Sequence, residues 1–169
     1  YGGGEAAGKL HGDAVVGADA LELQAGGHVT YAHRPEFDLV RKLSVKCRVR
    51  IGDTTTMPVI VSCGRFMQAG WFLQRFGRGW RWHVGGVSCD GGKPVPGEWT
   101  ELIATFDGAK ACLYQDGKLV REVSGAANRA PWEGVLHIGQ YSGGPAPQYQ
   151  VAGQISNVEI FGCALTGTQ

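Results

Sequence analysis

The stretch that decides the fold runs from residue 97 to residue 123 and reads GEWTELIATFDGAKACLYQDGKLVREV. Apolar and polar residues alternate around two dipeptides, Asp107-Gly108 and Asp116-Gly117. Alternation is typical of a strand with one face on a core and the other in water, because successive side chains of a strand point to opposite faces. Asp-Gly supplies the positive φ angles of type I′ hairpin turns. The stretch therefore predicts a three-stranded antiparallel meander.

The same alternation recurs along the chain. It is cleanest over residues 43–51, LSVKCRVRI, where every odd position is apolar and every even position is polar or charged. We expect further strands over residues 20–24, 57–63, 70–76, 80–84, 99–106, 111–115, 118–123, 135–138 and 150–161. Loops are expected at residues 52–56, 89–97, 124–131 and 141–147. Short strands at this spacing predict an all-β, antiparallel two-sheet sandwich with less than about one-tenth helix.

Length and charge limit the classes of protein and partner. The 169 residues fit one domain, so we expect residues 1–169 to form a single unit. The formal net charge of +1, from 16 basic and 15 acidic residues, gives no global attraction to nucleic acid or to an anionic membrane. No apolar run approaches the roughly 20 residues that cross a bilayer. Neither a nucleic-acid partner nor membrane insertion is therefore expected.

The cysteines and histidines do not predict a metal site. The 5 cysteines contain no C-x-x-C pair, and their odd number leaves at least one thiol unpaired within a monomer. Their disulfide pairing stays open, although Cys47 falls in phase with apolar positions and is expected to be a small buried hydrophobe. His28 and His33, five positions apart, could chelate a metal, but ordinary exposed histidines are the simpler interpretation. We expect no metal ligands.

Three stretches in register carry a family resemblance. Residues 17–23 look like an opening strand, and residues 153–166 look like a closing strand with its turn. Between them, Trp99 opens a strand that ends in an aromatic-Asp-Gly turn, followed by Leu113-Tyr114-x-Asp-Gly. Together they resemble the laminin-G-like domains of the concanavalin A-like lectin/glucanase jelly rolls. The resemblance implies a function among lectins, carbohydrate-binding modules, adhesion domains and polysaccharide-cleaving enzymes. Trp99 is expected to bury its ring at the mouth of the sandwich.

Catalysis and calcium are both disfavoured by the acidic residues. Jelly-roll glycosidases need two carboxylates about 5–9 Å apart, whereas Glu98 and Glu101 stand three apart on one strand and point to opposite faces. We therefore expect no enzyme activity, with a cryptic polysaccharide hydrolase or lyase as an open alternative. The resemblance also implies a calcium site in many relatives, but Gln24, Ser156 and Asn157 stand where acidic ligands are frequent. No cofactor is expected, and a structural calcium ion stays open.

Aromatic and arginine side chains are concentrated between residues 70 and 86. Alternation places Trp80 and Trp82 on the core face of one strand and Arg81 and His83 on the other face. We expect an outward ligand-binding surface made of Arg75, Arg81, His83, Trp132, Tyr141 and Tyr149. Sugar rings stack on aromatic rings, and guanidinium groups bind hydroxyl or carboxylate oxygens, so this mixture suits a glycan, especially an anionic one. The alternative for each loop aromatic is a hydrophobic plug over the sandwich edge.

The basic stripe of Lys46, Arg48 and Arg50 is interpreted as a solvated outer face, because no aromatic residue is interleaved with it. The sequence thus predicts a non-catalytic, lectin-like module of a larger bacterial protein, extracellular or at the cell surface. Its expected partners are a glycan or polysaccharide and other domains of the same polypeptide. The alternative is a protein-protein interaction or spacer domain without sugar affinity.

Overall fold

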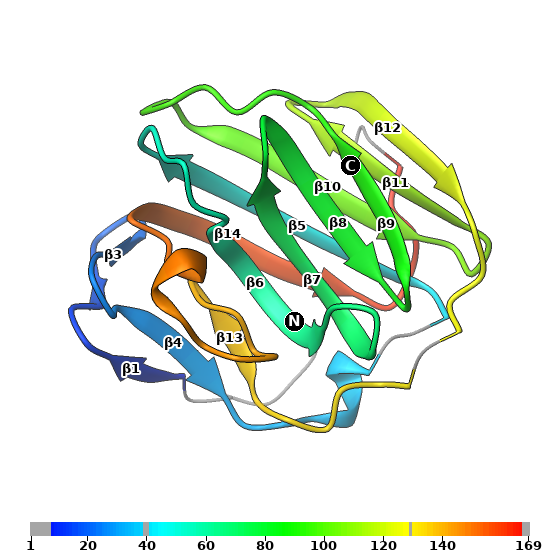
Figure 1. Cartoon of the computed structure of the whole chain (residues 1–169), viewed down its shortest axis with the longest axis horizontal. Helices are drawn as coiled ribbons and strands as arrows, with labels where there is room; N and C mark the ends of the chain where they lie inside the picture. The colour runs from blue at the N-terminus through cyan, green and yellow to red at the C-terminus, as the bar shows by residue number, and fades with distance from the viewer. Residues whose placement is uncertain (1–7, 39–40, 129, 167–169) are drawn as a thin grey trace.

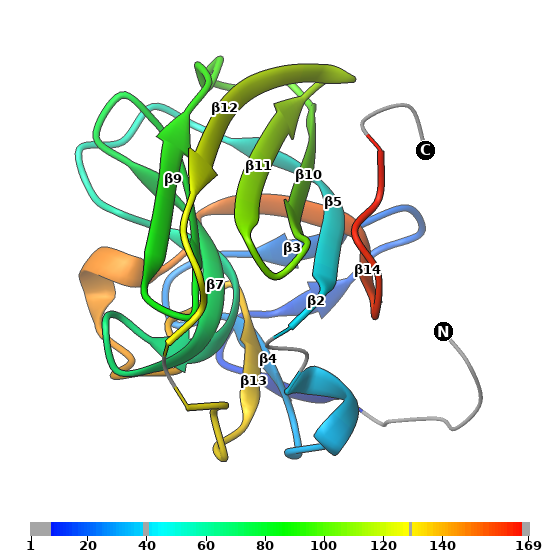
Figure 2. The same ribbon diagram turned by 90° about the vertical axis from the view of Figure 1, so that its right-hand side faces the viewer.

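Two antiparallel sheets of seven strands each pack face to face (Figures 1 and 2). This computed structural model describes residues 8–38, 41–128 and 130–166. Sheet A has the order β1 (Lys9–His11), β4 (His28–Tyr31), β13 (Leu136–Ile138), β6 (Val59–Arg65), β7 (Ala69–Phe76), β8 (Gly79–Val84) and β9 (Val87–Gly91). Sheet B has the order β12 (Lys118–Ser124), β11 (Lys110–Gln115), β10 (Thr100–Phe106), β5 (Leu43–Ile51), β14 (Gly153–Phe161), β3 (Leu21–Leu23) and β2 (Val15–Val16).

The core lies between the sheets and follows the predicted alternation. On β5 the odd positions Leu43, Val45 and Cys47 are fully buried. On sheet A the rings of Trp71 and Trp82 are buried with centroids 5.9 Å apart. The apolar face of each strand therefore determines which side of its sheet faces inward. The predicted all-β, two-sheet jelly roll is confirmed.

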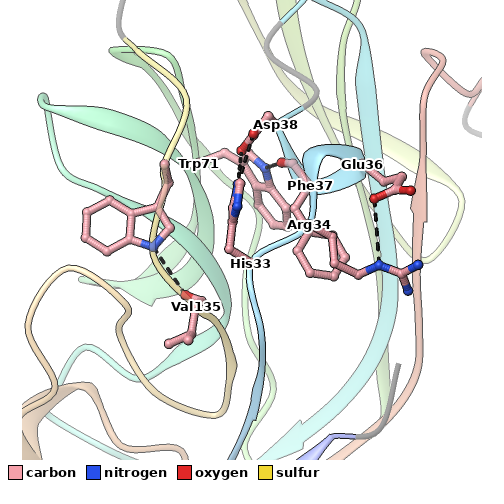
Figure 3. A network of polar contacts seen from close by, with 8 residues as sticks. His33, Arg34, Glu36, Phe37, Asp38, Trp71 and Val135 are labelled. Atoms are coloured by element: carbon pink, nitrogen blue, oxygen red, sulfur yellow. Dashed lines mark hydrogen bonds and ion pairs between the residues drawn. The ribbon is translucent and has the colours of Figure 1, made fainter. Parts of the chain in front are cut away.

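In the part of the chain that the structure describes, helix is confined to two short 3-10 turns, η1 (Pro35–Phe37) and η2 (Pro147–Tyr149). Trp71 holds η1 in place, because its indole Nε1 donates to the Phe37 carbonyl at 2.9 Å (Figure 3). None of the helices in the described residues is both long and apolar enough to cross a lipid bilayer.

The predicted meander is confirmed as β10, β11 and β12, but its two turns differ. Asp116 and Gly117 both have positive φ, 49° and 79°, as a type I′ turn requires. At the other turn only Gly108 does, with φ 102°. Asp107 instead accepts hydrogen bonds at Oδ1 from the N–H groups of the two residues that follow Gly108, each at 2.8 Å. The type I′ prediction is wrong there, because the Asp107 side chain closes the turn.

Four strands were missed by sequence reasoning, namely β1, β2, β4 and β9. Of these, β9 matters most, because a loop was predicted from residue 89 onward. Its register with β8 sets Cys89 opposite Trp82, in the core, and Asp90 opposite Arg81, on the outer face. A strand that reads VSCDG has weak intrinsic β propensity, so its pairing with β8 and the burial of Cys89 in the core stabilise it.

Candidate functional site

The structure separates the six side chains that the sequence assigned to one surface. Arg75 lies opposite Trp80 in the β7–β8 register and therefore shares the inner face of sheet A with that core residue. Alternation along the two strands puts Arg75 and Arg81 on opposite faces. Trp132 is half-buried against the core, and its Nε1 donates to the Val135 carbonyl at 3.2 Å. Both placements correct the prediction, since Trp132 is the plug over the sandwich edge.

The other four residues come together on the outer face of sheet A. Three of them, Arg81, Tyr141 and Tyr149, line a groove of about 460 Å³. The residues that line it are Met57, Val59, Phe66, Phe72, Gln74, Phe76, Arg81, Tyr141 and Tyr149. We call it the aromatic groove, because most of its lining residues are Phe or Tyr. Rings gathered around a concave surface favour a ligand with flat apolar faces.

His83 lies beneath the aromatic groove. Its side chain is only 1% exposed, and its ring stacks on Phe72 with centroids 5.0 Å apart. Its Nε2 accepts from the Met67 backbone N–H at 3.1 Å, so the neutral ring carries its proton on Nδ1, 2.8 Å from Ser88 Oγ. The expectation that His83 faces a ligand is wrong. It positions Phe72 and the turn at Met67 instead.

The segment of residues 140–150, orange in Figures 1 and 2, folds over the outer face of sheet A and forms one wall of the groove. Ser142 fixes this wall to β6. Its hydroxyl donates to the Gly64 carbonyl at 2.6 Å, and its backbone N–H donates to Ser62 Oγ at 3.1 Å. The Gly64 N–H in turn donates to Ser142 Oγ at 2.8 Å. Because these polar groups are buried and paired, the wall is set before a ligand arrives.

Phe66 stands on the turn between β6 and β7 with a ring that is 45% exposed. Its backbone N–H donates to the Tyr141 hydroxyl at 2.6 Å. The Tyr141 ring in turn packs edge-on against Tyr149, with centroids 4.8 Å apart. Burial raises the pKa of Tyr141, and the hydrogen bond from Phe66 opposes that rise. Tyr141 therefore stays neutral near pH 7 and ties the exposed ring of Phe66 to the wall.

Arg81 brings a guanidinium group whose charge is already matched. Its Nε and one Nη donate to different oxygens of Asp90, each at 2.8 Å. The same group lies 3.5 Å from the ring centroid of Phe76 and 5.5 Å from that of Phe66. A bidentate carboxylate and two ring contacts hold the guanidinium in one orientation. Arg81 thus gives the groove a planar surface and not a free positive charge.

Sequence reasoning did not assign Phe66, Phe72 or Phe76 to the site. Alternation already placed Phe72 and Phe76 on the face opposite Trp71, which was the available signal. The missing information was the β7–β8 register, in which Phe72 lies opposite His83. Phe66 carried no signal, because it belongs to a turn.

A larger hollow of about 690 Å³ lies among loop residues at one end of the sandwich. It is lined by small residues and prolines of segments 25–26, 51–58 and 140–152. Its amide side chains already serve the loops: Gln140 Oε1 accepts from the Ala146 N–H at 3.3 Å, and Gln150 Nε2 donates to the Val151 carbonyl at 2.8 Å. Because none of its described lining residues is aromatic, this hollow is a weaker candidate than the aromatic groove.

The histidine pair considered as a metal chelate is divided between two places. His28 stacks against His11 and His137, with centroids 4.5 and 5.6 Å away. His33 Nε2 is instead 3.0 Å from a carboxylate oxygen of Asp38 (Figure 3). Within residues 8–38, 41–128 and 130–166, no three His, Cys, Asp or Glu side chains are grouped to hold a metal ion.

Comparison with known families gives one match. A family model, Laminin_G_3, described as the concanavalin A-like lectin/glucanases superfamily, matches residues 23–169. No curated protein matches the chain. The laminin-G-like resemblance of the sequence is therefore confirmed.

Several solved structures share the fold at low sequence identity. The binding domain of botulinum neurotoxin serotype C1 is 12% identical, with a TM-score of 0.73 over 96% of this chain and 45% of that one. A structure of botulinum neurotoxin type C, whose cell entry depends on interaction with two ganglioside molecules, is 11% identical, with a TM-score of 0.74 over 96% and 44%. The neurotoxin DC binding domain in complex with SialylT is 11% identical, with a TM-score of 0.71 over 96% and 44%. The chain spans less than half the length of these structures.

Proposed function

The chain belongs to the concanavalin A-like lectin/glucanases superfamily, and from this premise we propose that it is a non-catalytic carbohydrate-binding module whose site is the aromatic groove. The observation that carries the proposal is the preformed wall of the groove. Ser142 fixes the wall through a buried hydrogen bond and Tyr141 fixes the Phe66 turn through a partly buried one, so the rings are positioned without a ligand. Preorganised rings lower the entropy cost of stacking a sugar on them.

The likeness to neurotoxin structures supports a glycan as the ligand. The cell entry of one of those proteins depends on interaction with two ganglioside molecules, and another was solved in complex with SialylT. At 11% identity this likeness concerns the fold, so the choice of ligand rests on the chemistry of the groove itself.

A neutral saccharide suits the aromatic groove better than the anionic one expected from the sequence. The charge of Arg81 is taken up by both oxygens of Asp90, and Arg75 lies on the inner face of the sheet. The Gln74 amide is also engaged, since it donates to the Met57 carbonyl at 3.2 Å. What the groove presents is ring faces, with few unused charges to bind a carboxylate.

Binding without catalysis also fits this lining. Glycoside hydrolysis needs two carboxyl groups about 5–9 Å apart across the scissile bond. The described residues that line the groove include no Asp or Glu, and Asp90 beside it is held by Arg81. We propose further that the module belongs to a larger secreted or cell-surface protein, and its coverage of less than half of each neurotoxin structure fits a module of that kind.

The test is Phe66→Ala in titrations against a panel of neutral oligosaccharides. We expect micromolar to millimolar dissociation constants for the native protein, and a loss of about 1–2 kcal/mol, roughly 5- to 30-fold, in the variant. Because the ring is 45% exposed, the melting temperature should fall by no more than about 3 °C. Phe66 thereby separates binding from folding.

Leu119→Ala is the matched control. Leu119 is 51% exposed on β12 of sheet B, so its truncation removes a similar exposed apolar group away from the groove. Its binding should equal that of the native protein. If no neutral oligosaccharide binds, or if Phe66→Ala binds as well as native protein, the proposal fails and the spacer alternative takes its place.

A further inference from the structure

Trp99 lies on the outer face of sheet B, although its sequence context predicted a ring at the mouth of the sandwich. Two guanidinium groups lie over its indole ring, with the Cζ atoms of Arg48 and Arg50 at 5.2 and 5.3 Å from the centroid. Trp99 itself is half-buried. The basic stripe of β5 therefore does contain an aromatic partner, which the sequence could not show.

The β5–β10 register explains this meeting. Thr100 lies opposite Val49, so Trp99, one residue earlier, continues the strand path beside Arg50. Arg48 and Arg50 are two positions apart on a strand and share one face. Two like charges this close repel each other, and the indole compensates through cation–π contact. Trp99 thus contacts two guanidinium groups that share one face of β5. We call these three residues the basic platform.

Ion pairing separates the third basic residue from the platform. Lys46 Nζ is 3.7 Å from Glu101 Oε2, and Glu159 lies opposite Lys46 in the β5–β14 register. Among the described residues, the ion pairs do not include Arg48 or Arg50. Arg50 donates from Nε to Gln154 Oε1, which leaves its two Nη groups outside that bond. The platform therefore offers two guanidinium groups with unused donors.

We propose that the basic platform is a second glycan site, specific for a saccharide that carries a sulfate or carboxylate group. A guanidinium fork matches the oxygens of such an oxyanion in bidentate fashion, and two adjacent forks bind one oxyanion or two on neighbouring sugars. The platform lies on the sheet opposite the aromatic groove, so the two sites bind independently. The anionic ligand expected from the sequence thus belongs to sheet B and the neutral one to sheet A.

The surrounding charges favour a short anionic saccharide over nucleic acid. Glu101 lies opposite Arg48, and Glu22 lies opposite Gln154 in the next strand of the sheet. These carboxylates lie at the borders of the platform, so an extended run of phosphates would meet negative charge beyond its contacts with the two arginines. The net charge of +1 adds no long-range attraction.

Calorimetric titration with chondroitin and chondroitin sulfate tetrasaccharides tests the platform, with a cello-oligosaccharide as the neutral probe. Chondroitin carries only carboxylates, so comparison of the two anionic probes distinguishes the two oxyanions. We expect at least one of them to bind and to lose affinity as salt rises from about 20 to 300 mM. The double variant Arg48→Gln/Arg50→Gln should bind at least about tenfold more weakly.

Lys46→Gln, which removes one charge where the double variant removes two, is the control on the same face of the same strand. Because Lys46 is already paired with Glu101, we expect its loss to change the affinity by less than about twofold. Arg48→Lys/Arg50→Lys keeps the charge and the fold but removes the planar forks, so its affinity should fall between native and double Gln variant. Phe66→Ala should leave anionic binding unchanged, which keeps this test separate from that of the groove.

Three results would each overturn the proposal. The first is that neither anionic tetrasaccharide binds the native protein. The second is that Lys46→Gln weakens binding as much as the double variant does. The third is that a short DNA duplex of equal charge binds as tightly as the tetrasaccharide. The last result would make the platform a general polyanion surface. If Arg48→Gln/Arg50→Gln does not fold, the affinity of Arg48→Lys/Arg50→Lys still tests the proposal.

Discussion

Replacing Trp82 with alanine tests the packing that joins the two sheets. The indole is fully buried, and its Nε1 donates to the carbonyl of Thr105 on sheet B at 3.1 Å. Removing a buried Trp costs about 3–5 kcal/mol, and the Thr105 carbonyl left without its donor adds about 1 kcal/mol. In a domain of this size each kcal/mol lowers the melting temperature by about 2–4 °C. We therefore expect a fall of about 10–20 °C.

Differential scanning calorimetry measures this fall, and Trp82→Phe is the companion variant. Phenylalanine keeps an aromatic ring but lacks the N–H donor, so its cost should be about 1–3 kcal/mol. The difference between the two variants separates the volume of the ring from its hydrogen bond. A fall below about 4 °C for Trp82→Ala would refute the reasoning, because the sheets would then not depend on this side chain.

Three further outcomes follow from burial. Trp132→Ala should lower the free energy of unfolding by about 2 kcal/mol in denaturant titrations and leave glycan affinity unchanged, because the half-buried ring packs on the core; weaker binding at unchanged stability would contradict its placement. Burial and neighbouring histidines lower the pKa values of His11 and His137 below the ordinary 6.5. As the pH falls, these two histidines are therefore protonated in the unfolded chain at a higher pH than in the folded protein. Stability should be full above about pH 6.5 and fall as the pH drops below it, and urea midpoints for His137→Gln should show a flatter profile. All five cysteines are free thiols, and burial raises the pKa of Cys47 to about 12, so the exposed Cys163 alone should react quickly with a thiol reagent in native protein; two or more fast thiols would disprove this.

Local pattern determined much of the fold. Alternation over residues 43–51 predicted β5 with its bounds, because a period of two is a property of the strand itself. Asp116-Gly117 set a hairpin for the same local reason, since the turn needs positive φ at both positions. Alternation also put Arg81 and His83 on the face opposite Trp82. Alternation could not show that His83 is covered, because the residues that cover it are Phe66 on a turn and Phe72 on another strand.

The candidate sites were decided by tertiary structure. Ser142 meets Gly64 across 78 positions of sequence, and Arg81 meets Asp90 through a strand whose own residues do not predict it. Trp99 reaches the guanidinium groups of β5 only because β10 pairs with that strand in one register. Period and turn chemistry act over a few residues, whereas the meeting of distant side chains depends on which strands pair and in which register. Alternation by itself determined the two faces of the regular strands it identified, whereas the pairing of strands determined which side chains share a site, including the inner position of Arg75 and the outer position of Trp99.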